Sequence, residues 1–159
     1  MHDQYNRKID YLRISLTDRC NLHCRYCQPE VSEHVTHNEI LRYEELLRIC
    51  RAALQLGIRK FKITGGEPLL RKGCSDFIAN LKQLEGAEQV TLTTNGTLLS
   101  NQLPALIAAG VDSINVSLDT LDAAYYTELT GGSLDSVLQA LQELQSAGIP
   151  FKLNCVPLA

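Results

Sequence analysis

Three cysteines stand close together near the start of the sequence, at Cys20, Cys24 and Cys27. Thiolates at such short spacings can fold around one metal centre. An iron–sulfur cluster of four irons that is held by three protein thiolates keeps one iron open to a ligand from outside the protein. An open coordination position allows chemistry at the metal, whereas a closed site serves structure. The spacing therefore indicates an iron–sulfur cluster that takes part in a reaction.

Two other interpretations of these thiols remain open. Three cysteines and a histidine form a common structural zinc site, and His23, His34 and His37 are nearby. The thiols could also be buried without any metal. We favour the cluster, because the rest of the chain does not resemble a zinc module. Among the other cysteines, Cys50 falls on the apolar face of an expected helix, where core packing is its expected role.

The composition is that of one globular domain. The chain has 159 residues, of which 45% are hydrophobic and 21% charged. The net charge is −3 and no basic block occurs, which argues against a nucleic-acid partner. The sequence contains neither an apolar run long enough to span a membrane nor a secretory signal. Six cysteines without an export signal lead us to expect a reducing, cytoplasmic location.

Strands and helices are predicted to alternate along the chain. Such alternation gives parallel strands joined by right-handed crossovers, so the predicted class is α/β, either barrel-like or doubly wound. The expected strands are Tyr11–Leu16, Lys60–Thr64, Gln89–Thr93, Ser113–Leu118 and Phe151–Val156. The expected helices are Tyr43–Leu56, Ser75–Leu84, Gln102–Ala109 and Leu134–Ala147.

Each expected strand alternates apolar with polar residues, as Phe61 and Ile63 do with Lys62. Parallel strands that are buried on both faces would be continuously apolar instead. The apolar face should therefore lie under the helices, and the polar face should line a wet cavity.

The polar face carries Arg13, Lys62 and Lys152 and no carboxylate. Three cations that converge on one cavity suit an anionic substrate such as a polyphosphate. Each of them alone could be a surface residue with a solvated charge. Their occurrence on one face of adjacent strands favours the ligand-binding interpretation.

Irregular motifs follow the carboxyl ends of four expected strands. The cysteine loop, which should run to about Glu33, follows the first, and the turn Gly65–Pro68 follows the second. The segment Thr94–Gly96 follows the third, and Asp119 closes the fourth. Active sites of parallel barrels lie at this end of the sheet, and glycine lets backbone approach a ligand closely. We therefore expect the site there.

The spacing of the cysteines, with an aromatic residue before the third, resembles the signature of radical S-adenosylmethionine (SAM) enzymes. The wider run from Arg13 to Glu30 is similar to that of one family among them, the GTP 3',8-cyclases. The resemblance covers nearly the whole chain. It implies a partial parallel (β/α) barrel of the radical SAM type, with the cluster loop after the first strand.

The resemblance also implies the cofactors and their ligands. In radical SAM enzymes the open iron of a 4Fe–4S cluster holds SAM, whose reductive cleavage gives a radical that abstracts a substrate hydrogen atom. Matching positions assign the cluster to Cys20, Cys24 and Cys27, and SAM contacts to Tyr26, Gly66 and Ser117. They assign GTP contacts to Arg13, Lys62, Thr93 and Lys152.

The implied activity is conversion of GTP to (8S)-3',8-cyclo-7,8-dihydroguanosine 5'-triphosphate, the first step of molybdenum cofactor (molybdopterin) biosynthesis. The implied partners are an electron donor such as flavodoxin or ferredoxin and, downstream, cyclic pyranopterin monophosphate synthase; a homodimer is compatible with the resemblance. Cyclases continue into a C-terminal region that binds a second cluster, so we expect residues 1–159 to be the N-terminal radical SAM core. The alternatives are a non-catalytic remnant that binds cluster and SAM, or another radical SAM enzyme, such as a peptide-modifying one.

Overall fold

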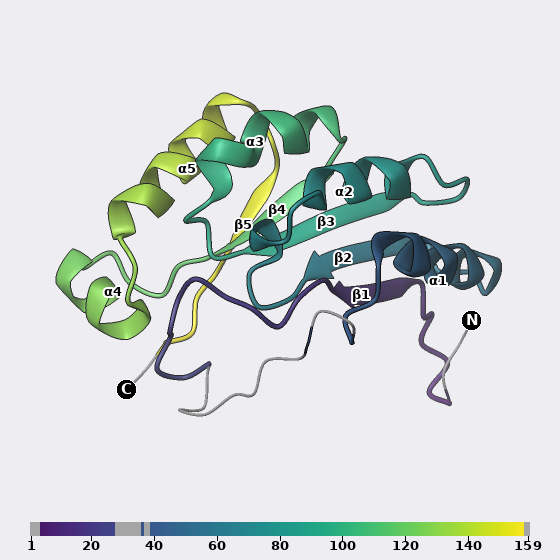
Figure 1. Ribbon diagram of the computed structural model, residues 1–159, viewed down its shortest axis with the longest axis horizontal. Helices are drawn as coiled ribbons and strands as arrows, with labels where there is room; N and C mark the ends of the chain where they lie inside the picture. Colours follow the sequence, from purple (N-terminus) through teal and green to yellow (C-terminus); the bar gives the residue numbers. More distant parts are fainter. Residues whose placement is uncertain (1–3, 28–35, 37–38, 158–159) are drawn as a thin grey trace.

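A computed structural model of the protein describes residues 4–27, 36 and 39–157. Its strands and helices alternate along the chain (Figure 1). The strands are β1 (Tyr11–Ser15), β2 (Lys60–Thr64), β3 (Gln89–Thr94), β4 (Ser113–Ser117) and β5 (Phe151–Asn154). The α-helices are α1 (Tyr43–Gln55), α2 (Cys74–Lys82), α3 (Leu99–Ala108), α4 (Ala123–Thr130) and α5 (Leu134–Ser146), and a short 3₁₀ helix, η1, spans Pro68–Leu70.

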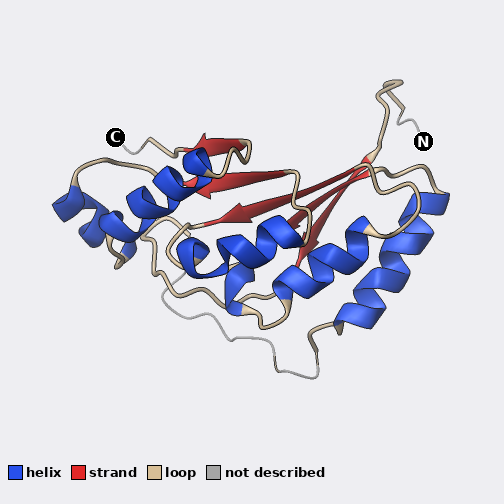
Figure 2. Ribbon diagram, turned by 90° about the horizontal axis from the view of Figure 1, so that it is seen from above, coloured by secondary structure: helices blue, strands red, loops and turns tan. Residues whose placement is uncertain are grey.

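The strand order in the sheet follows the order in the chain, from β1 at one edge to β5 at the other. Every neighbouring pair is parallel. A doubly wound sheet reverses its direction of growth partway and carries helices on both faces, whereas a barrel adds each strand beside the last. The helices lie on one side of this sheet (Figure 2). The fold is therefore α/β and consistent with a partial parallel barrel, as predicted.

The hydrophobic core lies between the sheet and the helices. Phe61 and Ile63 of β2 are buried on the helix side, and Lys62 between them faces the other way and is partly exposed. The same alternation places Val90 and Leu92 of β3 in the core. We call the face away from the helices the polar face of the sheet. It lies outside the hydrophobic core, as the sequence predicts.

Helix α1 ends in a turn that returns the chain to the sheet. Gly57 has a φ of 92°, a conformation that favours glycine. The backbone N–H of Gly57 donates to Leu54, and the N–H of Ile58 donates to Ala53. This pair of bonds is a Schellman cap, which satisfies carbonyls at the helix end and directs Ile58 into the core.

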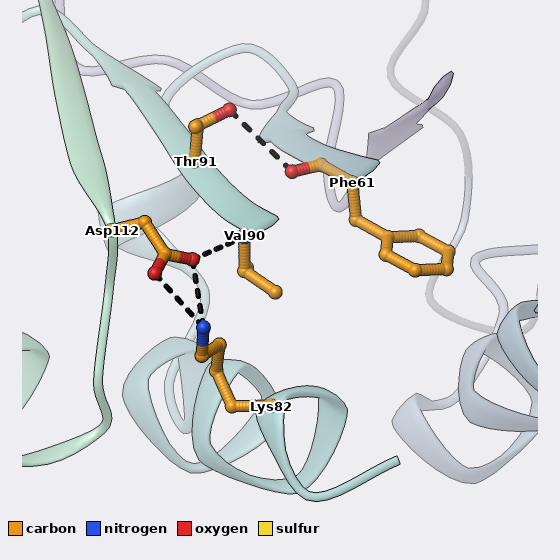
Figure 3. Close-up of polar contacts among 5 residues, drawn as sticks. All are labelled: Phe61, Lys82, Val90, Thr91 and Asp112. Atoms are coloured by element: carbon orange, nitrogen blue, oxygen red, sulfur yellow. Dashed lines mark hydrogen bonds and ion pairs between the residues drawn. The ribbon is translucent and has the colours of Figure 1, made fainter. Parts of the chain in front are cut away.

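The amino end of the sheet is held by a cluster around Asp112 (Figure 3). The ammonium group of Lys82, at the end of α2, lies 2.9 Å from both carboxylate oxygens of Asp112. The backbone N–H of Val90 donates to the same carboxylate at 2.6 Å. The hydroxyl of Thr91 donates to the carbonyl of Phe61 at 3.4 Å. These contacts lie at the opposite end of the sheet from the cysteine loop.

The predicted strands are confirmed to within two residues at their ends, and two helices were not predicted. Helix α3 begins at Leu99, three residues before the expected start. Helix α4 and the 3₁₀ helix η1 occupy segments to which no element was assigned. The expected end of the cysteine loop, near Glu33, lies outside the described residues.

None of the helices in the described part of the chain is long and apolar enough to cross a membrane.

Candidate functional site at the carboxyl end of the sheet

A cavity of about 320 Å³ opens where the cysteine loop leaves β1. The residues that line it include all three predicted cluster ligands and both glycines of the turn after β2: Cys20, Cys24, Cys27, Gly65 and Gly66, together with Ser15, Thr17, Asp18 and Leu22. All three thiols are free of disulfides. The fold thus brings together thiols and glycines that lie about forty residues apart in the sequence.

The donor set of this cavity fits an iron–sulfur cluster better than zinc. Three thiols, the ligands that iron–sulfur clusters use, line the cavity. The cavity is larger than one ion needs, and no histidine is among its described lining residues. Of the histidines in the zinc alternative, His34 and His37 lie outside the described residues. The cysteine assignment itself stays a prediction.

The pKa of Cys24 is raised, first by burial and then by the neighbouring thiols of Cys20 and Cys27 and the carboxylate of Asp119. A thiolate at Cys24 would therefore be stabilised by a positive centre beside it. A metal cluster supplies such a centre, which agrees with the donor set.

Helix α4 holds the cysteine loop in place. The backbone N–H of His23 donates to the carbonyl of Thr130 at 2.9 Å, and that of Arg25 donates to Leu129 at 3.0 Å. Both carbonyls belong to the last turn of α4, where no further intrahelical donor is available. Leu22 packs against Gly132. A Cβ added at Gly132 would lie only 2.6 Å from the Cδ2 atom of Leu22.

The turn after β2 docks onto the cysteine loop through its backbone. The N–H of Gly66 donates to the carbonyl of Thr17 at 2.6 Å, and the N–H of Glu67 donates to that of Arg19 at 2.7 Å. A Cβ at Gly66 would overlap the carbonyl of Arg19 and lie 2.7 Å from that of Asp18. Gly66 thus has a structural reason to be glycine, and its contact with SAM stays a prediction.

Glu67 is a site residue that the sequence analysis did not identify. Its carboxylate is fully buried and accepts hydrogen bonds from the Leu69 N–H, the Thr94 hydroxyl and the Asn95 N–H, at 3.0, 2.8 and 2.7 Å. Burial raises the pKa of Glu67, and the three donors partly offset that effect. The carboxylate joins the turn after β2 to the end of β3.

Asp119, which follows β4 by two residues, is a second site residue for which the sequence predicted no role. The hydroxyl of Tyr26 donates to one carboxylate oxygen of Asp119 at 2.5 Å. The backbone N–H of Val156 donates to the other oxygen at 2.9 Å. Burial and the Asp119 carboxylate raise the pKa of Tyr26. The predicted SAM-contacting tyrosine is therefore held between the ends of β4 and β5.

The predicted substrate residues share the polar face of the sheet. Arg13 and Lys62 are register partners on β1 and β2, and Thr93 and Lys152 are both register partners of Asn115 on β4. None of the three cations pairs with a carboxylate of a described residue, and the Arg13 guanidinium donates to the Thr64 hydroxyl at 3.4 Å.

The polar face leads directly into the cavity. Ser15 follows Arg13 by two residues on the same face of β1 and lines the cavity wall. Ser117, a predicted SAM contact, is the last residue of β4 and pairs in register with Asn154. It is not among the described residues that line this cavity.

The cysteine-lined cavity and the partial barrel define a class of enzyme. The chain matches the model of the radical SAM superfamily over residues 14–158, and it belongs to that superfamily. Members of the superfamily bind a 4Fe–4S cluster and SAM.

Curated relatives carry a more particular name. The chain is 48% identical over 160 residues to the GTP 3',8-cyclase of Thermodesulfovibrio yellowstonii, an alignment that covers 98% of this chain and 50% of the relative. It is 49% identical over 157 residues to the GTP 3',8-cyclase of Geobacter sulfurreducens, covering 97% and 48%. The chain therefore spans about half the length of the curated relatives it matches.

Solved structures share the fold at low sequence identity. Streptococcus suis SuiB bound to its precursor peptide SuiA superposes with a TM-score of 0.77 at 23% identity, covering 92% of this chain and 32% of SuiB. Native anSMEcpe with bound AdoMet superposes with a TM-score of 0.72 at 22% identity, covering 91% and 43%. At these identities the likeness supports the fold alone.

Proposed function

We propose that this chain carries the cluster, the SAM site and the triphosphate-binding cations of a GTP 3',8-cyclase, which acts in the first step of molybdenum cofactor biosynthesis. The observation that carries the proposal is the polar face of the sheet. Three cations without carboxylate partners among the described residues lie on the strands beside a cavity lined by three thiols. The cyclase relatives, at about 48% identity, support the choice of GTP.

Cys20, Cys24 and Cys27 would hold the cluster, which supplies the electron for reductive cleavage of SAM when it is bound. Tyr26, Gly66 and Ser117 would contact SAM. The turn after β2 sets the cavity wall at Gly66, and Asp119 orients the ring of Tyr26.

Arg13, Lys62 and Lys152 would neutralise the triphosphate of GTP, and the hydroxyl of Thr93 would add a hydrogen bond. The guanidinium of Arg13 presents a planar fork that can hold two phosphate oxygens, whereas the two lysines act as point charges. Because these residues stand on strands rather than on loops, the substrate is held at a fixed distance from the cavity.

The surroundings follow from the same proposal. A cluster with an open iron and several free thiols needs a reducing compartment, so we place the protein in the cytoplasm. Reduction of the cluster calls for a donor such as flavodoxin or ferredoxin, and the cyclic product is the substrate for cyclic pyranopterin monophosphate synthase.

The test is GTP binding by lysine variants. We expect Lys62→Ala and Lys152→Ala each to weaken GTP binding by at least about tenfold, since a hydrogen bond to a charged group contributes about 1.5–3 kcal/mol. SAM binding should change little, because neither lysine is among the described residues that line the cysteine cavity. Isothermal titration of anaerobically reconstituted protein with GTP and with SAM measures both affinities.

Lys60→Ala is the matched control. Lys60 lies on the same strand and the same face, but its ammonium already pairs with Asp10 at 3.1 Å. Its removal should change GTP affinity by no more than about twofold, because an exposed ion pair is screened by solvent and contributes little free energy. Unchanged GTP affinity in both test variants would contradict the proposed substrate. SAM cleavage without any GTP binding would favour another radical SAM reaction, and binding without cleavage would favour a non-catalytic protein.

A further inference from the structure

Asn95, directly after β3, reaches across to the first predicted cluster ligand. Its amide nitrogen lies 3.7 Å from the sulfur of Cys20 and 3.0 Å from the side-chain oxygen of Asn21. The backbone N–H of Leu22 lies 3.4 Å from the same sulfur. The sulfur of Cys20 thus receives two N–H donors, one from its own loop and one from a different strand end.

The orientation of the Asn95 amide is fixed by its other contacts. Its side-chain oxygen accepts the backbone N–H of Thr97 at 3.0 Å and the Thr97 hydroxyl at 2.7 Å. A backbone N–H can only donate, so the oxygen of the amide must face Thr97. The NH₂ group is therefore the end that points at Cys20 and Asn21.

The backbone of Asn95 is also anchored. Its N–H donates to the buried carboxylate of Glu67 at 2.7 Å, and the preceding Thr94 donates to the other carboxylate oxygen at 2.8 Å. Glu67 belongs to the turn that docks on the cysteine loop. One buried side chain thus fixes both the wall of the cavity and the position from which Asn95 donates.

We propose that Asn95 is a positioning residue whose amide donates a hydrogen bond to the Cys20 sulfur while that sulfur holds the cluster. Hydrogen bonds to ligand sulfurs stabilise the reduced cluster, which carries the greater negative charge, and so raise its reduction potential. Asn95 therefore makes the cluster easier to reduce before SAM is cleaved. The inference rests on the proposed cluster at Cys20, Cys24 and Cys27.

The test compares the reduction potential of the cluster in the reconstituted parent and in Asn95→Ala. We expect the variant to bind iron and sulfide in the same amounts as the parent and its midpoint potential to move to a more negative value. A redox titration followed by electron paramagnetic resonance of the reduced cluster gives the potential independently of turnover. Asn101→Ala, an exposed asparagine on α3, is the matched control and should leave the potential unchanged.

Thr97→Val serves as a second variant. It keeps the backbone donor to the Asn95 amide but removes the hydroxyl donor, so a smaller shift in the same direction is expected. If Asn95→Ala does not retain the cluster, the reduction potential of Thr97→Val tests the inference in its place. A potential equal to that of the parent in a fully loaded variant would overturn the inference and leave the proposed function standing. A parent protein that binds no iron and sulfide would overturn the proposed function itself.

Discussion

The six cysteines divide by their surroundings. Cys20, Cys24 and Cys27 line the cavity, Cys155 is exposed, and Cys50 and Cys74 are buried. Burial raises the pKa of Cys50 to about 11 and that of Cys74 to about 12. The buried thiols therefore act as small apolar groups in the core, the role predicted for Cys50 from its helix face.

We expect iodoacetamide at pH 8 to label Cys155 in the native protein and to leave Cys50 and Cys74 unmodified. The thiolate is the reactive form, and a thiol with a pKa of about 11 is ionised to only about 0.1% at that pH. Peptide mass spectrometry before and after guanidinium unfolding measures the labelling. Fast native labelling of Cys50 or Cys74 would show that these side chains are not packed as described.

The grouping of the three cysteines and of the three cations could be predicted from the sequence, but the partners that support them could not. Cysteine spacing identified the three thiols of the cavity wall, and strand alternation identified the cations of the polar face. Glu67, Asn95 and Asp119 escaped because their partners are distant in the sequence. Glu67 binds Thr94, 27 positions away, Asn95 contacts Cys20, 75 away, and Asp119 accepts from Tyr26, 93 away. Their common position just after strand ends was the one sequence feature that could have indicated a role in the site.

At the scale of elements, the cavity is built by loops that dock on one another. The turn after β2 pairs with the cysteine loop through the N–H groups of Gly66 and Glu67. The last turn of α4 supports the same loop from the other side, at His23 and Arg25. The loop that carries the cysteines is thus positioned by contacts to two other elements.

Gly66→Val should disrupt this docking. The added side chain would overlap the Arg19 carbonyl, so the turn and the cysteine loop must separate. We expect loss of SAM binding and a lower melting temperature. Calorimetric SAM titration and thermal unfolding of reconstituted protein check both effects.

Gly148→Ala is the control for that substitution. A Cβ at Gly148 meets nothing within 4 Å, although the φ of 67° strains a non-glycine residue there. It should cost about 1 kcal/mol of stability and leave SAM affinity unchanged. An unaltered SAM affinity in Gly66→Val would show that the turn does not form the cofactor site.

Helix α4 shows why some elements escape sequence reasoning. It has eight residues, including adjacent tyrosines and two β-branched threonines, and its apolar residues make no clear stripe. Only its ends are marked, by the Asp122 side chain that accepts the Tyr125 N–H and by Gly131 in the left-handed conformation. The five strands were easier to predict, because alternation with a period of two persists wherever one face is buried.

At the scale of the whole molecule, the hydrophobic core and the candidate site lie on different parts of the sheet. The helices and the core occupy one face of the sheet, and the Asp112 cluster holds its amino end (Figures 2 and 3). The cations lie on the opposite face, and the cysteine-lined cavity opens at the carboxyl end of β1. The proposed GTP-binding residues and the proposed cluster ligands therefore both lie outside the core between the sheet and the helices.

The most direct test of the central claim is the metal content after anaerobic reconstitution. We predict about four irons and four sulfides per chain, the content of one 4Fe–4S cluster. The cluster should be lost in Cys20→Ala, Cys24→Ala or Cys27→Ala and retained in Cys155→Ala, whose thiol is exposed. A stoichiometric zinc ion without sulfide, or a full cluster in any of the three cavity variants, would contradict the assignment.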